Sequence, residues 1–455
     1  MLGITGDALL RAMPWGLNAA LCIWAAVAAA AVLARWGRVP VTPDAPWLAL
    51  TAALLGAAFL RRDSEWLQFF DLVALGGVLA LGLLAARGAA LGGRSVLDYV
   101  VAALATAGNA AVGALRLTFG EIRWAEVPDG GRLRTVRAVG LGALIAAPAL
   151  LVFGALFASA DAVFAAVLDN VVAVELGEVV GHLALMAFFG TVASGYFAGA
   201  LLPARPGTLP SFTAWSPPSL GAVPVATALG LVNLLFLLFV VVQLRYLFGG
   251  ESLVLETTGL TLAEYARSGF FELVTVSGLV LPLLLAGDAV VPGTDAAGRR
   301  TFRRLAGLLL VLLGVVMVSA LERMRLYVAE FGLSEDRLYA TAFMGFLAIL
   351  FAWFAWTGLR ERRGRFAFGG VIQGFAVLAG LHLLNPDAVI ANVNLDRAAD
   401  GHRFDASYLT SVLSADAVPA LLERFTDLEA DQRCRVADGL VQRWGGAADR
   451  DWRSW

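Results

Sequence analysis

The sequence contains no lysine, because all 34 of its positively charged residues are arginine. A Schiff-base lysine and the lysine of a phosphate-binding loop are therefore excluded. Only two cysteines and three scattered histidines are present, so neither a disulfide framework nor a metal site is expected. No basic run suggests a nucleic-acid partner, and no hydrolase, zinc-protease or nucleotide-binding motif occurs. We accordingly expect no cofactor.

Charge of either sign is scarce. Only 15% of the residues are charged and 59% are hydrophobic, with a mean hydropathy of +0.76. In a soluble protein about a quarter of all residues are charged. The apolar residues come in runs of about twenty, the length at which a helix crosses a ~30 Å hydrocarbon core. Because backbone groups in lipid must be satisfied internally, such uninterrupted runs predict membrane-spanning helices.

The predicted fold class is an all-α, polytopic transmembrane bundle of about eleven spans, within a range of ten to twelve. The expected spans are residues 17–33, 45–60, 67–86, 97–115, 138–157, 180–202, 223–247, 270–290, 305–320, 338–359 and 366–384. Two or three short helices are expected in a polar tail after them. Three regions follow: N-terminal helices with a basic cytoplasmic loop (1–137), a core bundle that carries the polar motifs (138–385), and an extramembrane tail (386–455).

The arginine distribution predicts an orientation, because short cytoplasmic connections are enriched in arginine. In the eleven-span arrangement, connections on the N-terminal side carry 17 arginines and those on the opposite side carry 9, without the tail. The N-terminus is therefore predicted to be cytoplasmic and the tail exoplasmic, in the inner membrane of a bacterial cell. One miscounted span reverses every later side.

Four polar segments stand out beside the apolar runs. The first, residues 159–178, contains four acidic residues and no arginine. The second enters the eighth span and contains Glu264, Tyr265, Arg267 and Glu272. Glu264 has an ordinary helix-capping role available, and it can pair with Arg267 three residues later. Glu272 lies within the apolar run, where an unpaired carboxylate costs about 2.5–3.5 kcal/mol.

The third segment closes the ninth span and contains Arg323, Arg325, Tyr327 and Glu330. Arg323, Tyr327 and Glu330 follow each other at helical spacing and so share one face. Two arginines with an acid and a tyrosine exceed what membrane anchoring requires. The alternative is that the arginines stabilise the helix C-terminus and extend to the lipid headgroups.

The fourth segment starts the tail and contains Asn385, Asp387 and Asn392. Pro386 disfavours helical backbone at Asn385, so the chain is expected to leave the membrane there. His382 precedes this point by one turn. These residues also fit ordinary turn chemistry. Asp71, inside the third span, is a second carboxylate within an apolar run, where it is costly unless it has a partner.

In the eleven-span arrangement all four segments lie on one side of the membrane. Glu272 could then take Arg323 or Arg325 as its counter-ion, as intramembrane charges generally require. A cleft lined by paired arginine and glutamate, with tyrosine and asparagine, would suit a polar or anionic small ligand.

Several of these runs resemble an uncharacterised family of bacterial multi-pass membrane proteins, domain of unknown function 4173. The similar runs are AEYARSGFFEL, LERMRLYVAEFGLSEDRLYA, NPDAVIANVNLDR, YLTSVLSADAVPALLERF and FASADAVF, and the likeness covers residues 153–424. The resemblance implies a membrane protein and assigns no activity and no catalytic residue.

Three functions remain open, and whether the protein is an enzyme is not decided. An exoplasmic membrane enzyme would use Glu272 or Asp387 as acid or base on an envelope-related or anionic substrate. A transporter would use a glutamate–arginine pair as a gate. A sensor or assembly factor would bind a protein partner through its tail. In each case the lipid bilayer is the surrounding partner.

Overall fold

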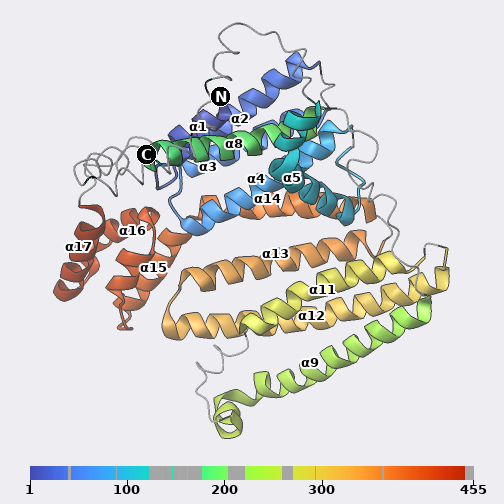
Figure 1. Ribbon diagram of the computed structural model, residues 1–455. Coiled ribbons are helices and arrows are strands. Elements are labelled where there is room, and N and C mark those ends of the chain that lie inside the picture. Colours follow the sequence, from blue (N-terminus) through green and yellow to red (C-terminus); the bar gives the residue numbers. More distant parts are fainter. Residues whose placement is uncertain are drawn as a thin grey trace. The chain divides into compact units, whose positions relative to one another are not determined.

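The chain is helical throughout the part that the structure describes. The computed structural model (Figure 1) describes residues 1–38, 42–88, 90–121, 177–202, 221–258, 270–292, 294–360 and 363–445, and single residues 139, 146, 153 and 161 between them. Within these ranges no strand occurs, and nine helices are long and apolar enough to cross a membrane. The predicted all-α, polytopic integral membrane protein is therefore confirmed.

The nine candidate spans match nine of the eleven expected ones. They are α2 (Leu17–Trp36), α4 (Glu65–Ala86), α5 (Val96–Arg116), α8 (Gly177–Leu201), α9 (Ala222–Thr258), α11 (Phe270–Val290), α12 (Ala296–Phe331), α13 (Glu335–Thr357) and α14 (Phe366–Leu384). A tenth expected span is the shorter helix α3 (Ala45–Phe59). The expected span 138–157 lies outside the described residues, apart from residues 139, 146 and 153.

The chain forms two compact units. Unit 1 contains Met1–Met13, Leu21–Val41 and Leu104–Ala204, and unit 2 contains Pro14–Ala20, Thr42–Ala103 and Arg205–Trp455. In unit 1 the short helix α1 (Leu2–Leu10) packs against α8 through glycines. A Cβ on Gly3 would lie 2.5 Å from the Met186 carbonyl oxygen, so only a glycine permits this approach. Small residues at such contacts are typical of helices that associate in membranes.

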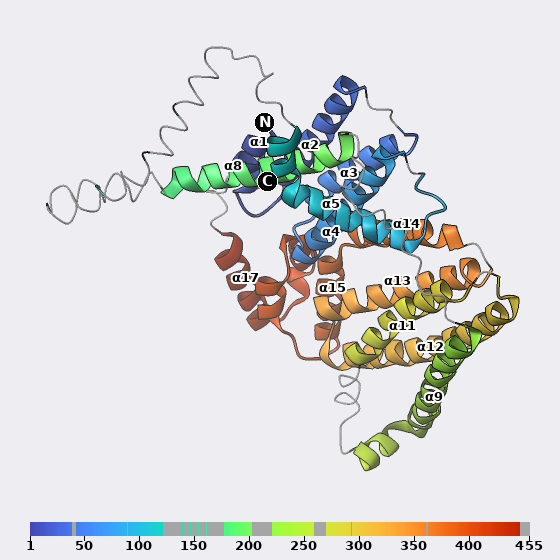
Figure 2. The same ribbon diagram turned by 45° about the vertical axis from the view of Figure 1, so that its right-hand side comes forward.

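The core of unit 2 is formed by α9, α11, α12 and α13. Figure 2 shows α11, α12 and α13 side by side, with α9 along α12. The fully buried side chains of α12 recur every three or four residues, as one helix face requires. They include Phe302, Ala306, Leu309, Leu313, Val316 and Ala320.

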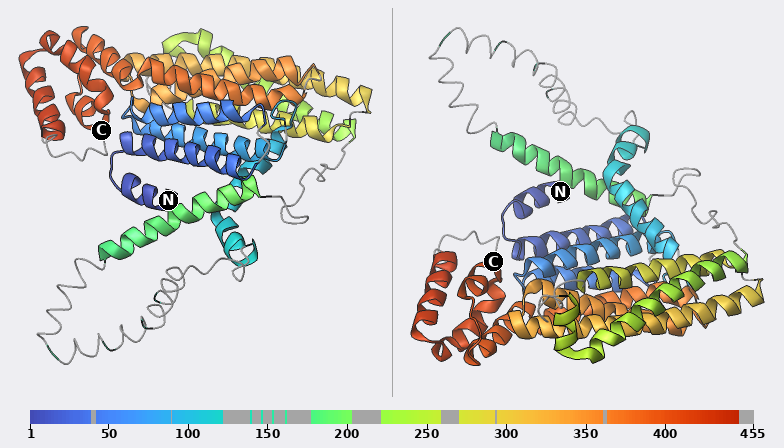
Figure 3. Two further views of the ribbon diagram at one scale, coloured as in Figure 1. Left: turned by 90° about the horizontal axis from the view of Figure 1, so that it is seen from above. Right: turned by 90° about the horizontal axis from the view of Figure 1, so that it is seen from below.

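The polar tail is folded onto one end of the unit 2 helices (Figure 3). It contains α15 (Pro386–Ala399), α16 (Val418–Glu423) and α17 (Ala430–Trp444), as the sequence predicted. Ile390, Ala391 and Leu395 of α15 are buried in contact with the bundle and the rest of the tail. The tail is therefore an integral part of unit 2.

The connection before α4 lies at the same end of unit 2 as the tail, because Arg62 pairs with Asp416. At the other end the α4–α5 turn meets the α13–α14 turn, where a Cβ on Gly364 would lie 2.7 Å from the Gly93 oxygen. The eleven-span count assigns the two members of each pair to opposite sides of a membrane. The alternation of sides in that count is therefore wrong within unit 2. A single error in the number of crossings is enough to reverse the side assigned to every later connection.

The start of α2 also lies at the tail end. Gln68, in the first turns of α4, donates a hydrogen bond of 3.1 Å from its amide to the carbonyl oxygen of Trp15. An even number of crossings therefore separates residues 14–20 from the tail. The expectation of a cytoplasmic N-terminus with an exoplasmic tail required an odd number, so the arginine count on which it rested no longer applies.

Candidate functional site

The residues predicted for the second polar segment are mostly outside the described part of the chain. Glu264, Tyr265 and Arg267 lie there. Glu272 is described, and it is an exposed side chain in the first turn of α11. This position near a helix N-terminus suits a carboxylate and does not bury it.

The predicted arginines of the third segment lie on α12. Arg325 is exposed and pairs with Glu322 of the same helix, with 3.1 Å between Nη1 and Oε1. Such an exposed pair contributes little to stability. Arg323 is half-buried. The carboxylate that Arg325 contacts is thus Glu322 and not the predicted Glu272.

Tyr327 and Glu330 lie where α12 ends and the tail begins to contact it. The Arg337 guanidinium stacks on the Tyr327 ring, 3.9 Å from its centroid. Arg397 of α15 donates to the carbonyl oxygens of Ala329 and Glu330, the latter over 2.9 Å. These arginines satisfy carbonyl groups that a helix C-terminus leaves unpaired. The third and fourth segments therefore meet, and these contacts join the end of α12 to the tail.

The polar contacts continue from α15 to the start of α13. Asn394 donates 2.7 Å to the Leu333 carbonyl and accepts 3.0 Å from the Leu333 amide. The hydroxyl oxygen of Tyr408 accepts a 2.9 Å hydrogen bond from the Glu335 amide, in the first turn of α13. Burial raises the pKa of Tyr408 to about 12, so this hydroxyl stays protonated. Asn392 is exposed, and its carbonyl faces Arg424.

Asn385 begins the tail in a left-handed conformation, with φ of 56°. Asparagine tolerates this region better than most residues. Its Oδ1 accepts from the Ala388 amide and caps α15, and its Nδ2 donates 3.2 Å to the Asp416 carbonyl. Asn385 thereby joins the end of α14, the start of α15 and a later part of the tail.

Asp387 is completely buried, at 0% exposure. Its Oδ2 accepts hydrogen bonds from the amide and the hydroxyl of Ser414, the first over 3.1 Å. Its Oδ1 is also buried and has no hydrogen-bond partner among the described residues. Burial raises the pKa of Asp387, and the bonds from Ser414 oppose that rise. A buried carboxyl with one unpaired oxygen is suited to carry a proton.

Arg62 and Asp416 form the ion pair at the centre of this end of unit 2. Their Nη1 and Oδ1 atoms are 3.7 Å apart, and the side chains are 11% and 12% exposed. The second oxygen of Asp416 accepts 3.0 Å from the Asp63 amide. Burial raises the pKa of Asp416, while the Asp63 amide and the Arg62 guanidinium lower it. The connection before α4 therefore holds the tail by a nearly buried charge pair.

Inside the candidate spans, His382 of α14 contacts Asp71 of α4. Nε2 of His382 lies 2.9 Å from Oδ1 of Asp71, whose side chain is 1% exposed. Arg62 donates two hydrogen bonds, of 3.0 and 2.7 Å, to the His382 carbonyl oxygen. Nδ1 of His382 is buried and has no hydrogen-bond partner in the described structure. We call Asp71, His382, Arg62, Asp416 and Asp387 the polar cluster.

Sequence reasoning identified parts of this cluster without assembling it. It singled out Asp71 and Asp387, and it noted that His382 precedes Asn385 by one turn. It missed Arg62 and Asp416 as functional candidates. The signal for Arg62 is an arginine followed directly by an aspartate in a short connection between two apolar runs.

Unit 1 holds a second histidine–aspartate contact. Nδ1 of His182 lies 2.7 Å from Oδ2 of Asp7, and its Nε2 lies 2.5 Å from Nη1 of Arg11. Arginine is only a donor, so Nε2 accepts and Nδ1 carries the hydrogen that bonds Asp7. This arrangement gives both ring nitrogens of His182 a hydrogen-bond partner.

The parts of the chain that the structure describes contain no group of three or more histidine, cysteine, aspartate or glutamate side chains able to hold a metal ion.

One family model matches most of the chain. It is described as a domain of unknown function (DUF4153), and it covers residues 49–424. The expected resemblance to an uncharacterised family is confirmed, although the number is 4153 where the resemblance pointed to 4173. No curated protein and no solved structure matches the chain.

Proposed function

The chain belongs to the DUF4153 family, and we propose that it is a proton-linked membrane transporter whose proton site is the Asp71–His382 pair. The observation that carries the proposal is the contact of these two side chains within candidate spans, at 2.9 Å and nearly without exposure. Ionisable residues in a membrane are costly, and they are typical of proton relays and ion pathways.

The chemistry of the pair follows from its hydrogen bonds. With His382 neutral, Nε2–H donates to the Asp71 carboxylate and Nδ1 keeps its lone pair. A proton that arrives at Nδ1 converts the imidazole to imidazolium, which the adjacent carboxylate stabilises. The pair can therefore bind and release one proton without breaking its own hydrogen bond.

Arg62 links the proton site to the tail. It donates to the His382 carbonyl and pairs with Asp416, so one guanidinium contacts both α14 and the tail. A positive charge on His382 repels Arg62 and weakens its hold on that carbonyl. In the proposed cycle Arg62 then exchanges Asp416 for a small anionic solute, the substrate class suggested by the sequence.

Burial favours transport over an enzyme that acts on a large envelope substrate. Asp71 and Asp387 are 1% and 0% exposed, and Arg62 and Asp416 are only slightly more so. Protons and small ions reach such side chains, whereas a bulky lipid-linked substrate does not. The proposed location is a bacterial cell membrane.

The test is charge movement after a pH jump on protein-containing liposomes adsorbed to a solid support. The wild type is expected to give a transient current as the pair takes up protons. The double variant Asp71→Asn, His382→Gln keeps a donor and an acceptor at the contact but cannot titrate, so the current should disappear. Asp431→Asn, at an exposed ion pair of α17, is the control and should keep the current.

Gel filtration in detergent verifies that both variants remain folded. An undiminished current in the folded double variant contradicts the proposal. A current lost equally in Asp431→Asn would assign the signal to surface titration and would also contradict it.

A further inference from the structure

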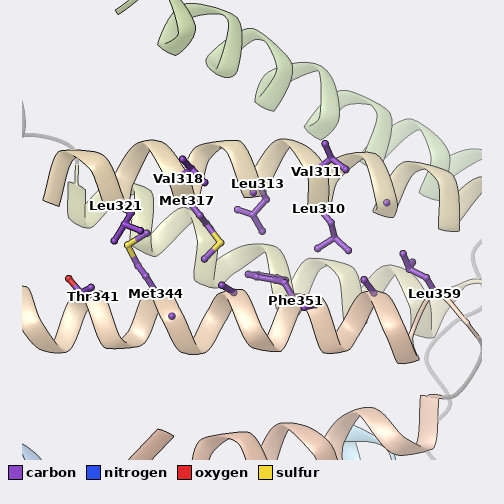
Figure 4. A pocket seen from close by; sticks show the side chains of 16 residues that line it. Leu310, Val311, Leu313, Met317, Val318, Leu321, Thr341, Met344, Phe351 and Leu359 are labelled. Carbon is purple, nitrogen blue, oxygen red and sulfur yellow. The ribbon is translucent and has the colours of Figure 1, made fainter. Parts of the chain in front are cut away.

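A groove runs between α12 and α13 on unit 2 (Figure 4). It has a volume of about 530 Å³. Leu321, Thr341 and Met344 lie toward one end, and Leu359 lies at the other, with Met317 and Phe351 between them. Among the described residues that line the groove, Thr341 alone has a polar side chain.

Small residues give the groove its depth. Gly307 and Gly314 of α12 face Gly345 and Ala348 of α13 across it. A Cβ added to Gly314 or Gly345 would meet no atom within 4 Å, so open space lies above both. From Gly307 to Leu321 the helix rises about 21 Å, which is most of a hydrocarbon core of ~30 Å. The dimensions suit an extended hydrocarbon chain.

Arginines cluster at the Leu359 end. Arg300 and Arg304 precede Gly307 by seven and three residues, so they continue the face of α12 that lines the groove. Arg360 directly follows Leu359, and its guanidinium stacks 4.0 Å from the centroid of the Trp356 ring. All three arginine side chains are exposed.

Trp356 also indicates where this end lies in a membrane. Tryptophan is enriched at the membrane–water interface, where its ring lies at headgroup level. The exposed Trp356 ring therefore places the guanidinium of Arg360 among the lipid headgroups. An apolar groove within the hydrocarbon core thus ends at a basic group at the level of the phosphates.

We infer that this groove binds an anionic phospholipid. One acyl chain lies along α12 and α13, and the headgroup phosphate contacts Arg300, Arg304 and Arg360. Guanidinium groups form charge-assisted, often bidentate hydrogen bonds with phosphate oxygens. Basic pockets between membrane helices select acidic lipids over neutral ones. The charge at one end distinguishes this groove from an ordinary lipid-facing surface.

The test measures binding of phosphatidylglycerol and of phosphatidylcholine with identical acyl chains to the purified full-length protein in detergent. Native mass spectrometry counts the bound lipids, and the thermal midpoint reports on them independently. We expect phosphatidylglycerol to bind at least ten-fold more tightly than phosphatidylcholine. Arg300→Gln, Arg304→Gln and Arg360→Gln together should remove that preference.

A second variant tests the acyl chain. Gly314→Leu fills the groove without a backbone clash and should weaken phosphatidylglycerol binding at least ten-fold. Gly278→Leu on α11 is the matched control, because its Cβ also meets open space and it lies outside the groove. Its binding should equal that of the wild type.

Three results would overturn the inference. Equal affinity for the two lipids would identify an unselective lipid-facing surface. Unchanged binding in Gly314→Leu would mean that no acyl chain occupies the groove. A change of oligomeric state in Gly314→Leu, with lipid binding retained, would identify a helix-docking interface instead.

Discussion

His382 and Asp71 are 311 residues apart in the sequence, and their side chains meet at 2.9 Å between two candidate membrane spans. His382 by itself has an ordinary explanation, as a polar residue in the last turn of α14. Together they form an acid–base pair whose free imidazole nitrogen is buried. The pair, with Arg62 behind it, connects the helices of unit 2 to the tail.

Loss of the Arg62 charge should destabilise unit 2. Arg62→Gln leaves Asp416 without its counter-ion in a nearly buried position, which typically costs about 3–5 kcal/mol. The measurement is the thermal midpoint of unfolding in detergent, which is monitored by tryptophan fluorescence. Arg435→Gln removes a pair whose side chains are mostly exposed, and it should change stability by less than about 0.5 kcal/mol. Equal midpoints for the two variants would exclude a structural role for the Arg62–Asp416 pair.

Asp387 should make stability depend on pH. Burial raises its pKa, so the folded state binds its proton more tightly than the unfolded state. The free energy of unfolding should therefore fall as the pH rises through and above the usual carboxyl range. Asp387→Asn resembles the protonated form and should flatten this slope at pH values above the usual carboxyl range.

Asp387→Ala separates charge from hydrogen bonding. It removes the acceptor for the Ser414 amide and hydroxyl, so it should be less stable than Asp387→Asn at every pH by about 1–3 kcal/mol. A slope in Asp387→Asn as steep as in the wild type would assign the pH dependence to another group.

Gly195 should be intolerant of any side chain. A Cβ there would clash with the Asn109 carbonyl oxygen, so α8 and α5 would have to separate within unit 1. Gly195→Ala should lower the thermal midpoint and the yield of monodisperse protein. Gly181→Ala lies on the same helix in open space and should be neutral or slightly stabilising, because alanine favours a helix by up to about 1 kcal/mol. Comparable losses in both variants would contradict close packing at Gly195.

Thiol labelling should show which connections share a side of the membrane. Cys434 lies exposed in the tail, and Cys22 is the other native cysteine. In a protein with Cys22 replaced, we measure labelling by an impermeant thiol reagent on intact cells. Cys434 and an Arg61→Cys variant should be labelled to the same extent. Gly92→Cys, in a background without Cys434, should show the opposite accessibility. Matching results for Arg61→Cys and Gly92→Cys would contradict the two ends described for unit 2.

Hydropathy predicted the helices well because crossing a bilayer imposes a length and a composition on each segment separately. α12 illustrates the limit of that reasoning, since its apolar run predicted a span over 305–320 whereas the helix covers Ala296–Phe331. Its basic first turns and polar last turns continue the helix beyond the apolar run. Charge therefore did not mark the helix ends.

The polar cluster was only partly predictable because sequence periodicity gives the face of a residue and not its neighbour. Asp71 was suspect from its position in a span, yet nothing local indicated His382 as its partner. Glu272 looked buried by the same reasoning and is exposed at the start of α11. The alternation of sides along eleven spans also placed the Arg62 connection and the tail on opposite sides of the membrane, whereas Arg62 pairs with Asp416 of the tail.

The Asp63–Asp416 hydrogen bond joins residues 353 positions apart, so the end of unit 2 closes only when almost the whole chain exists. At about 5–20 residues per second, synthesis of that interval takes roughly 20–70 s. During this time the Arg62 guanidinium and the Asp71 carboxyl lack the partners that the tail and α14 supply. A chain that ends before α14 therefore contains both charged side chains without the partners that pair with them in unit 2.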